Sequence, residues 1–302
     1  MRRFRIINAD VLDGLRSLPD GSVRCCVTSP PYWGLRDYGK EGQIGLEPTP
    51  EEYVSKLVEV FREVRRVLAD DGTVWLNLGD SYAANRSYQV TPSKWPGLKQ
   101  GQSASVPDGL KPKDLVGIPW RVAFALQSDG WWLRQDLIWS KPNPMPESVR
   151  DRCTKAHEYV FLLSKAARYY YDIDAIKESA SGRSCGNKPG GRSGSRAKGF
   201  EVRDFSKVAD KKYHTRIRRS VWNLPTQPYK GAHFAVMPQA LVEPCILAGS
   251  AEGDTVLDPF SGSGTVGVVA LRLARKFVGI ELNAEYAEMA RNRILNDAPL
   301  LN

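Results

Sequence analysis

Apolar residues along the chain alternate between short continuous runs and runs with helical spacing. The run at 23–27 is typical of a buried strand, and a similar run at 73–78 predicts a second one. Between them, residues 51–68 repeat valine, leucine and phenylalanine every three or four positions, which predicts an amphipathic helix. Thr49 before Pro50 supplies a capping side chain and a favourable first helical residue. This strand–helix–strand order predicts a doubly wound α/β sheet.

Other segments extend the same alternation, and a turn at 70–72 is expected to separate the long helix from the second strand. Two segments lack periodicity: a polar one at 83–113, and one rich in glycine, serine and arginine at 179–220 that has too few apolar residues for a core of its own. The remaining predicted elements are strands at 3–7, 131–139, 254–257 and 277–280, helices at 12–18, 114–127, 237–247 and 266–274, and a hairpin of 158–163 with 169–171.

Two prolines end the first buried strand, in the sequence Thr28-Ser29-Pro30-Pro31-Tyr32. Because proline has no N–H to donate, the chain must leave the sheet here, at the carboxyl end of a strand, where open α/β sheets bind ligands. A carbonyl, a small hydroxyl and an aromatic ring at this point suit a flat, amino-bearing ring such as a nucleobase. The alternative is a Pro-Pro turn that closes a core strand, with Tyr32 as packing.

The segment at 33–39 combines two glycines with several large side chains. This mixture is compatible with a mobile flap over a pocket and equally with a plain surface loop.

A glycine-rich turn, DPFSGSGT at 258–265, lies between a predicted strand and a predicted helix. Glycines at such a turn let the backbone approach a ligand closely. The next strand ends in Glu281, whose carboxylate can accept hydrogen bonds from both hydroxyls of a ribose. The strand–helix–strand unit therefore predicts a nucleoside-binding half-fold.

The details of this turn narrow the choice of nucleoside. No lysine follows Gly264, so the phosphate cradle of ATP-hydrolysing enzymes is absent. Gly262, Gly264 and Gly267 formally match the dinucleotide pattern G-x-G-x-x-G. The DPF lead-in with Phe260 instead favours a nucleoside without a pyrophosphate, which indicates S-adenosylmethionine.

Composition adds exclusions. The 302 residues are 42% hydrophobic and 25% charged, as in ordinary globular proteins, and no apolar run reaches the length of a membrane span or a secretory signal. We therefore expect a cytoplasmic protein without a membrane partner. The five cysteines are scattered without a C-x-x-C pair and the three histidines lie far apart, so we expect reduced thiols and no metal site.

The net charge of +9 is concentrated in one segment. Residues 182–219 contain 12 Lys and Arg against 3 Asp and Glu, whereas basic and acidic residues are equal in number elsewhere. A solvated tail is one interpretation. A localised basic element on a neutral body is also what binding to a phosphate backbone requires.

The combination of TSPPY at 28–32 with DPFSGSGT at 258–265 and Glu281 resembles the S-adenosylmethionine-dependent DNA amino-methyltransferases. With TSPPY first and the glycine-rich motif last, the order resembles their circularly permuted β class. The likeness covers nearly all of the chain except 83–113 and 180–220. Supporting stretches are Asn8-Ala9-Asp10, Trp139-Ser140-Lys141-Pro142, His157-Glu158 and the helix after Pro238.

The resemblance implies a Rossmann-like methyltransferase sheet and a target base. S-P-P-Y is more typical of cytosine-N4 enzymes and D-P-P-Y of adenine-N6 enzymes, so Ser29 favours methyl transfer to cytosine N4 in duplex DNA. The alternatives are an adenine-N6 enzyme, an RNA or protein methyltransferase, and a non-catalytic DNA-binding protein that retains a cofactor site.

The resemblance also implies roles for individual residues. Ser29 and the Pro30 carbonyl would accept the amino hydrogens of a flipped base, and Tyr32, after Pro31, would stack on it. Asp10 would contact the adenine of the cofactor and Glu281 its ribose. The alternative role of each of these two residues is a helix cap. His157 is interpreted as a structural residue. The other implied cofactor contacts are Thr28, Asp258, Pro259, Phe260, Ser261, Gly262, Ser263, Gly264 and Thr265.

Residues 1–179 are accordingly interpreted as the catalytic part of one methyltransferase domain, with an excursion at 83–113, and residues 221–302 as its cofactor-binding part. Residues 180–220 match the family's target-recognition region. Candidate partners besides double-stranded DNA are a second copy of the chain and a cognate restriction endonuclease. The implied DNA-binding residues are Lys141, Arg183, Arg192, Arg196, Lys198, Arg203, Lys211, Lys212, Arg216, Arg218 and Arg219.

Overall fold

The computed structural model describes residues 3–35, 39–40, 42–83, 106, 109–180, 214–226 and 237–297. Internal contacts divide the chain into two units, one formed by Met1–Asp172 with Ser220–Asn302 and the other by Ile173–Arg219. The functional division at residues 180 and 220 stays a prediction.

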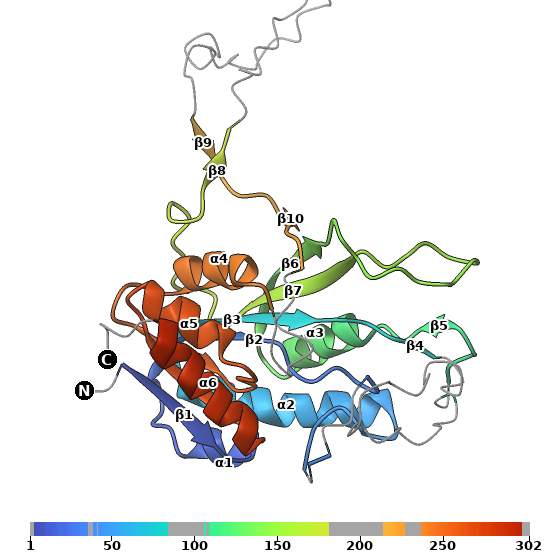
Figure 1. The fold of residues 1–302 in the computed structure, drawn as a ribbon, viewed down its shortest axis with the longest axis horizontal. Helices are drawn as coiled ribbons and strands as arrows, with labels where there is room; N and C mark the ends of the chain where they lie inside the picture. Colours follow the sequence, from blue (N-terminus) through green and yellow to red (C-terminus); the bar gives the residue numbers. More distant parts are fainter. Residues whose placement is uncertain are drawn as a thin grey trace, which may run out of the picture. The chain divides into compact units, whose positions relative to one another are not determined.

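An eight-stranded sheet forms the centre of the first unit, in the order β1-β12-β11-β2-β3-β7-β6-β10 (Figure 1). All neighbouring pairs are parallel except those that β7 makes with β3 and β6. The predicted doubly wound, mostly parallel sheet is therefore confirmed. Its strands are β1 (Phe4–Asn8), β2 (Val23–Thr28), β3 (Leu68–Leu78), β6 (Trp132–Ser140), β7 (His157–Ser164), β10 (Val221–Asn223), β11 (Thr255–Asp258) and β12 (Lys276–Glu281).

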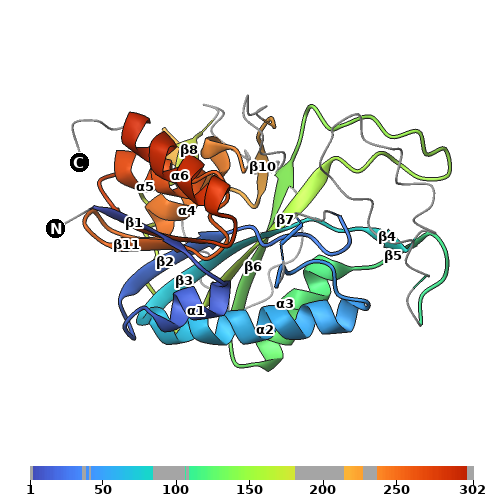
Figure 2. The ribbon, with the colours of Figure 1, turned by 60° about the horizontal axis from the view of Figure 1, so that its bottom comes forward.

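Helices cover both faces of this sheet (Figure 2). One layer contains α1 (Val11–Arg16), α2 (Pro50–Val67) and α3 (Ile118–Ser128), and the other contains α4 (Gln239–Gly249), α5 (Thr265–Arg272) and α6 (Ala284–Asp297). Two short antiparallel pairs lie outside the sheet: β4 (Tyr82–Ala83) with β5 (Asp114–Leu115), and, in the second unit, β8 (Glu178–Ser179) with β9 (Thr215–Arg216).

The long helix α2 follows its sequence signals closely. Thr49 Oγ1 accepts a hydrogen bond from the Glu52 N–H at 3.2 Å, and Pro50 is the first helical residue. Leu57, Phe61 and Val64 of its predicted inner face are buried in the core, and Tyr53 is buried beside them. Burial of this stripe, more than helix propensity, is what stabilises such a helix.

Two predicted features of the sheet are wrong. Residues 169–171 form no strand: the Tyr171 ring stacks on Trp75 with centroids 6.2 Å apart, so this aromatic run packs on the sheet, and β7 pairs with β6 and β3. Residues 70–72 form no separate turn but lie inside β3, where Val23 pairs with Leu68 and the register then shifts. A bulge absorbs the residues that the sequence suggested would turn.

Two helix boundaries also differ from the prediction. The helix expected from residue 114 begins at Ile118, because Asp114 and Leu115 pair with β4 and Gly117 takes a left-handed φ of 77°. The helix expected at 237–247 runs from Gln239 to Gly249.

The sheet changes winding direction between β11 and β2. The chain passes from β11 through α5 to β12, and β1 extends the sheet beyond it. From β2 it passes through α2 to β3 on the other side, while β11 and β2 themselves pair through Leu257 and Cys26. The carboxyl ends of these two strands are the topological switch point at which doubly wound folds bind ligands.

Gly249, at the end of α4, lies close to the central strands, and a substitution there tests how tightly this helix packs on the sheet. A Cβ there would lie 2.6 Å from Cys25 Sγ and 2.8 Å from Trp75 Nε1, so alanine must displace buried atoms. We expect Gly249→Ala to lower the free energy of unfolding by roughly 1–2 kcal/mol, because overpacking outweighs the better helix propensity of alanine. Urea denaturation measures this loss. The exposed Glu243→Ala on the same helix should leave the midpoint nearly unchanged, and equal midpoints for both variants would contradict the packing described.

Candidate active site

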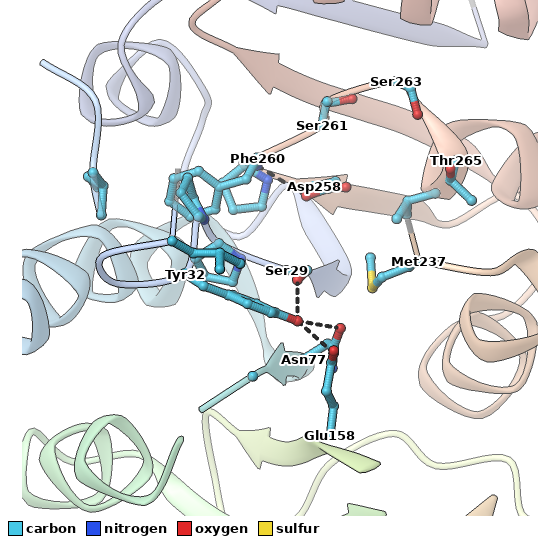
Figure 3. Close-up of a pocket in the computed structure, with 18 of the residues that line it drawn as sticks. Ser29, Tyr32, Asn77, Glu158, Met237, Asp258, Phe260, Ser261, Ser263 and Thr265 are labelled. Carbon is cyan, nitrogen blue, oxygen red and sulfur yellow. Dashed lines mark hydrogen bonds between the residues drawn. The ribbon is translucent and has the colours of Figure 1, made fainter. Parts of the chain in front are cut away.

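A cavity of about 980 Å³ opens at the carboxyl ends of the central strands (Figure 3). The SPPY residues line it from one side, and the glycine-rich turn with Glu281 lines it from the other. All of its lining residues belong to the first unit. The two motifs, some 230 positions apart in sequence, therefore face a common space large enough for a nucleoside and a base.

A buried hydrogen bond joins the two motifs at the base of the cavity. Thr28 Oγ1 donates to Asp258 Oδ1 at 2.7 Å, and the Phe260 N–H donates to the same oxygen at 3.1 Å. Burial raises the pKa of Asp258 to about 7, although these two donors act to lower it. Thr28 and Asp258 thus hold the ends of β2 and β11 together, and their direct contact with a cofactor stays a prediction.

Glu281 holds the glycine-rich turn. Its Oε2 accepts from the Gly262 N–H at 2.8 Å and its Oε1 from the Asn283 N–H at 2.9 Å, just before α6. Burial raises the pKa of Glu281, and the backbone donors act against this rise. A carboxylate has about four acceptor positions, so these two bonds leave capacity for ribose hydroxyls.

Asp10 caps a helix and lies at the cavity, and its contact with a cofactor stays a prediction. Its Oδ1 accepts from the Leu12 N–H at 2.8 Å and caps α1, and the residue also lines the cavity. Asp10 is the second residue after β1, and Glu281 ends β12, the strand paired with β1. The Phe260 ring lies at the same cavity. These groups together fit a nucleoside, because the two carboxylates can accept hydrogen bonds from its hydroxyl and amino groups and the aromatic ring can pack against its flat base.

Arg293 supports the turn from α6 and was not identified from the sequence. Its NH1 donates to Ser263 O at 3.2 Å, to Ser263 Oγ at 3.0 Å and to Thr265 Oγ1 at 2.9 Å. Both hydroxyl-bearing residues also line the cavity. Two side chains implied as cofactor contacts are thus positioned by a guanidinium group. Ser261, Pro259 and Gly262 line the cavity as well, whereas Gly264 takes a φ of 76° and packs against Ala290.

Ser29 and Tyr32 of the SPPY loop line the cavity, and hydrogen bonds link their hydroxyl groups to each other and to Glu158 (Figure 3). Ser29 Oγ donates to Tyr32 Oη at 3.4 Å, and Tyr32 Oη donates to Glu158 Oε2 at 2.6 Å. The Tyr53 hydroxyl donates to the Pro31 carbonyl at 2.8 Å. Desolvation raises the pKa of Tyr32, and the Glu158 carboxylate raises it further.

Glu158, on β7, connects this loop to β3 and to Lys141, and it was noted in the sequence only as part of a supporting stretch. Besides Tyr32, it accepts from Asn77 Nδ2 at 3.2 Å and pairs with Lys141 Nζ. Lys141 lies 4.4 Å from the centroid of the Trp139 ring. Asn77 is a polar residue inside the apolar run of β3, and that is the signal by which the sequence could have indicated it.

The loop after SPPY begins as part of the core. Trp33 is buried and its Nε1 donates to Glu47 O at 2.9 Å, so the segment expected as a flap or surface loop starts as packed structure. Residues 36–38 lie outside the described residues. His157 lines the cavity and packs edge-on against Tyr159, with ring centroids 5.4 Å apart.

Three of the arginines expected to bind DNA are described in the second unit, and Lys141 in the first. Arg216 Nε and Arg219 Nε each lie 2.7 Å from Glu178 Oε1, so these two side chains share one carboxylate. Arg218 lies between them in sequence. The expected residues outside the described part of the chain are Arg183, Arg192, Arg196, Lys198, Arg203, Lys211 and Lys212.

Searches for a metal site and for a membrane-spanning helix can be reported only for the described residues. They contain no group of three or more His, Cys, Asp or Glu side chains placed to hold a metal ion. Within the same residues, no helix has the length and apolar character needed to span a bilayer.

The cavity at the switch point of the sheet fits an α/β protein that binds a nucleoside, and comparison with known proteins specifies the class of this protein. The chain belongs to the DNA methylase family of N6 and N4 methyltransferases, whose model matches residues 23–292. It is therefore a DNA methyltransferase. It is 51% identical over 290 residues to the type II methyltransferase M.Cfr9I of Citrobacter freundii, covering 96% of this chain and 87% of that protein.

Solved structures share the fold. The cytosine-N4-specific PvuII DNA methyltransferase superposes with a TM-score of 0.65 at 19% identity, covering 100% of this chain and 93% of that one. A DNA modification methylase from Thermus thermophilus, complexed with S-adenosyl-L-methionine, superposes with a TM-score of 0.64 at 23% identity, covering 98% of this chain and 95% of that one.

The buried Asp258 predicts a pH-dependent stability. Its pKa is 3.8 in an unfolded reference and about 7 in the folded protein, so the folded state binds more protons between these values. The stability that this group contributes is fully present below about pH 4 and is lost as the pH rises to about 7. Asp258→Asn keeps an acceptor oxygen but cannot ionise.

We expect the free energy of unfolding of Asp258→Asn, relative to the unaltered chain, to increase from about pH 4 to 7 and then level off. A pKa difference of about three units at 1.36 kcal/mol each gives a total on the order of 4 kcal/mol. Urea denaturation at a series of pH values measures it. A difference that does not change with pH would contradict the burial of an ionisable Asp258.

Proposed function

We propose that this DNA methyltransferase transfers the methyl group of S-adenosylmethionine to the N4 amino group of a cytosine that is flipped out of duplex DNA. The observation that carries the proposal is the shared cavity: Ser29 and Tyr32 face the same space as Phe260 and Glu281. A base-binding half and a nucleoside-binding half that open on one space can bring two reactants together.

S-adenosylmethionine is the cofactor, and it supplies an electrophilic methyl group on a sulfonium. Glu281 would hold its ribose, and Asp10 and Phe260 would surround its adenine. The turn at 258–265, supported by Arg293 and Glu281, would line the methionine end. Because these groups are already fixed by protein hydrogen bonds, little ordering is needed when the cofactor binds.

Ser29 is proposed to activate the amino group of the base. An exocyclic amino nitrogen is a poor nucleophile because its lone pair is delocalised into the ring. Ser29 Oγ directs its own hydrogen toward Tyr32 Oη, so its lone pairs are available to accept an amino hydrogen. The Pro30 carbonyl would accept the second hydrogen. With both hydrogens held, the nitrogen can pyramidalise and direct its lone pair at the methyl carbon. The N–C bond would form as the S–C bond of the sulfonium breaks, so that S-adenosylhomocysteine is the leaving group, and one of the two amino protons would then pass to water.

Positioning is expected to supply most of the rate enhancement. A well-oriented pair of reactants gains roughly 7–11 kcal/mol over free encounter. Tyr32 would stack on the extruded base, which contributes roughly 1–3 kcal/mol per base in comparable sites. The hydrogen bond from Tyr32 to Glu158, and the close approach of the Tyr32 ring to Gly79, fix the orientation of that ring.

The choice of cytosine rests on Ser29, the residue at which cytosine-N4 and adenine-N6 enzymes typically differ. The PvuII methyltransferase, which shares the fold, is cytosine-N4-specific. Because M.Cfr9I is a type II methyltransferase, we further propose a restriction-modification role with a cognate endonuclease. A homodimer, phosphate contacts by Lys141 and sequence recognition by the basic segment at 180–220 belong to the same proposal.

The identity of the methylated base tests the proposal directly. The purified chain is incubated with methyl-labelled S-adenosylmethionine and DNAs of varied sequence, and the DNA is digested to nucleosides. We expect the label in N4-methylcytosine. Label in N6-methyladenine would overturn the cytosine assignment, and label in RNA or protein but not in DNA would overturn the substrate class.

Ser29→Ala tests the role of the hydroxyl. Loss of one preorganised hydrogen bond at a reacting group typically lowers kcat by about 100- to 1,000-fold, and we expect a loss in this range with DNA affinity retained. Single-turnover methylation and DNA-binding titrations measure the two quantities. The control is Ser22→Ala, at an exposed serine outside the cavity lining, which should leave both unchanged. Full activity of Ser29→Ala would contradict the mechanism.

A further inference from the structure

The connection between β6 and β7, residues 141–156, leaves the sheet on the side of the active site. β6 runs antiparallel to β7, which in turn runs antiparallel to β3, so the carboxyl end of β6 lies at the same edge of the sheet as the SPPY motif. The Lys141 N–H donates to Ala156 O at 2.8 Å and closes the base of the connection. Figure 2 shows it extending beyond the strands as an arm, and we call residues 141–156 the β6–β7 arm.

Met145 is the outstanding residue of this arm. Its side chain is 84% exposed, more than any other large hydrophobic side chain among the described residues. Scattered exposed apolar residues are common, but this one lines the cavity into which the proposed function places the extruded base. Pro144 and Pro146 flank it, and their rings restrict the backbone on both sides. A flexible, polarizable side chain is thus presented to solvent from a stiff backbone at the entrance to the site.

The β6–β7 arm is held in place by polar contacts on both sides of Met145. Before it, Asn143 and Thr226 form a reciprocal pair: Asn143 Nδ2 donates to Thr226 O at 3.3 Å, and the Thr226 N–H donates to Asn143 Oδ1 at 2.9 Å. After it, Glu147 accepts from Arg152 NH1 at 2.6 Å. The arm therefore does not depend on packing of Met145 for its conformation.

Two further contacts tie the returning half of the arm to the body of the first unit. The Arg152 guanidinium carbon lies 4.0 Å from the centroid of the Tyr82 ring, and Lys155 Nζ donates to Asp80 O at 3.1 Å. Asp80 itself accepts from the Gly117 and Ile118 N–H groups at the start of α3. An element anchored in this way can keep a protruding side chain in position against a bound partner.

The charge around Met145 suits DNA as that partner. Arg150 is exposed and lies five positions after Met145. The arm as a whole carries four cationic residues against two acidic ones: Lys141, Arg150, Arg152 and Lys155, with Glu147 and Asp151. Phosphate contacts from such groups position a protein on a duplex, and proteins that distort DNA insert apolar side chains such as methionine or proline between bases. An apolar residue on an arm of net positive charge, at the entrance to a base-binding cavity, combines both features.

We propose that Met145 enters the duplex and fills the space vacated by the flipped base, as a positioning residue for the DNA substrate. The inference rests on the proposed function. Extrusion of a base costs a few kcal/mol in lost stacking and pairing. Contact of the Met145 side chain with the neighbouring base pairs offsets part of this cost, and the extruded state becomes more populated.

The test compares Met145→Ala with Met145→Leu and with a control on the same arm, Val149→Ala. Val149 is 44% exposed and does not line the cavity. Each variant methylates two versions of a duplex that the unaltered chain methylates, one with the target base paired and one with it mispaired. A mispaired base is easier to extrude, so a defect in flipping is specifically relieved there.

We expect Met145→Ala to lower kcat/KM on the paired duplex by about 10- to 100-fold. On the mispaired duplex, the kcat/KM of this variant should lie within about threefold of that of the unaltered chain. Met145→Leu should retain most of the activity on both, and Val149→Ala should match the unaltered chain. A fluorescent purine analogue beside the target base should report less unstacking with Met145→Ala.

An equal loss of kcat/KM on both duplexes would overturn the inference, since it would indicate a general DNA contact. An unchanged kcat/KM of Met145→Ala on the paired duplex would overturn it as well. Because the Met145 side chain is exposed, its substitution should leave the thermal unfolding of the protein unchanged. Equal unfolding temperatures for the variants and the unaltered chain exclude misfolding as the cause of a lower rate. Absence of methylation by the unaltered chain on any DNA is a different result: it rejects the proposed function, and the inference with it.

Discussion

The hydrogen bond from Thr28 to Asp258 marks the constraint on which the site depends. β2 and β11 must lie side by side, although about 230 residues separate them, because each brings one half of the cavity to its carboxyl end. The bond lies in the protein interior, where an unpaired carboxyl or hydroxyl group would be costly. Displacing one strand by a residue would therefore break this bond and also separate the two motifs.

The polar groups around the cavity are shared between structure and binding. Asp10 caps α1, Glu281 holds the glycine-rich turn, and Glu158 holds Tyr32 and Lys141. Each of these carboxylates also borders the cavity. Protein hydrogen bonds thus fix the groups in the positions from which they could contact a ligand. This arrangement suits a reaction that depends mainly on orientation.

The sequence predicted the parts of this structure that are encoded locally. The cap at Thr49, the buried face of α2 and the two loops at the ends of β2 and β11 all follow from short patterns. The predicted hairpin of 158–163 with 169–171 was wrong. A run of aromatic residues is typical of a strand, but here Tyr171 stacks on Trp75 and the run packs on the sheet without joining it. The bulge in β3 was missed for a similar reason, since its register depends on β2.

The site residues that the sequence did not reveal act over long distances in the chain. Glu158 meets Tyr32 across 126 positions, and Arg293 meets Thr265 across 28 positions and from a different element. No local pattern distinguishes such a glutamate or arginine from a solvated one. Only Asn77, a polar residue in an apolar strand, carried a signal that local reasoning could have used.

The central claim is that a methyl donor and an extruded base meet in the cavity at the carboxyl ends of β2 and β11. A crystal structure with S-adenosylhomocysteine and a duplex containing the methylated site measures this most directly. The account predicts the cofactor sulfur between Phe260 and Ser29, with the amino nitrogen of an unpaired base facing it at hydrogen-bonding distance, about 2.6–3.2 Å, from Ser29 Oγ. A cofactor bound outside this cavity, or a target base still paired in the duplex, would contradict it.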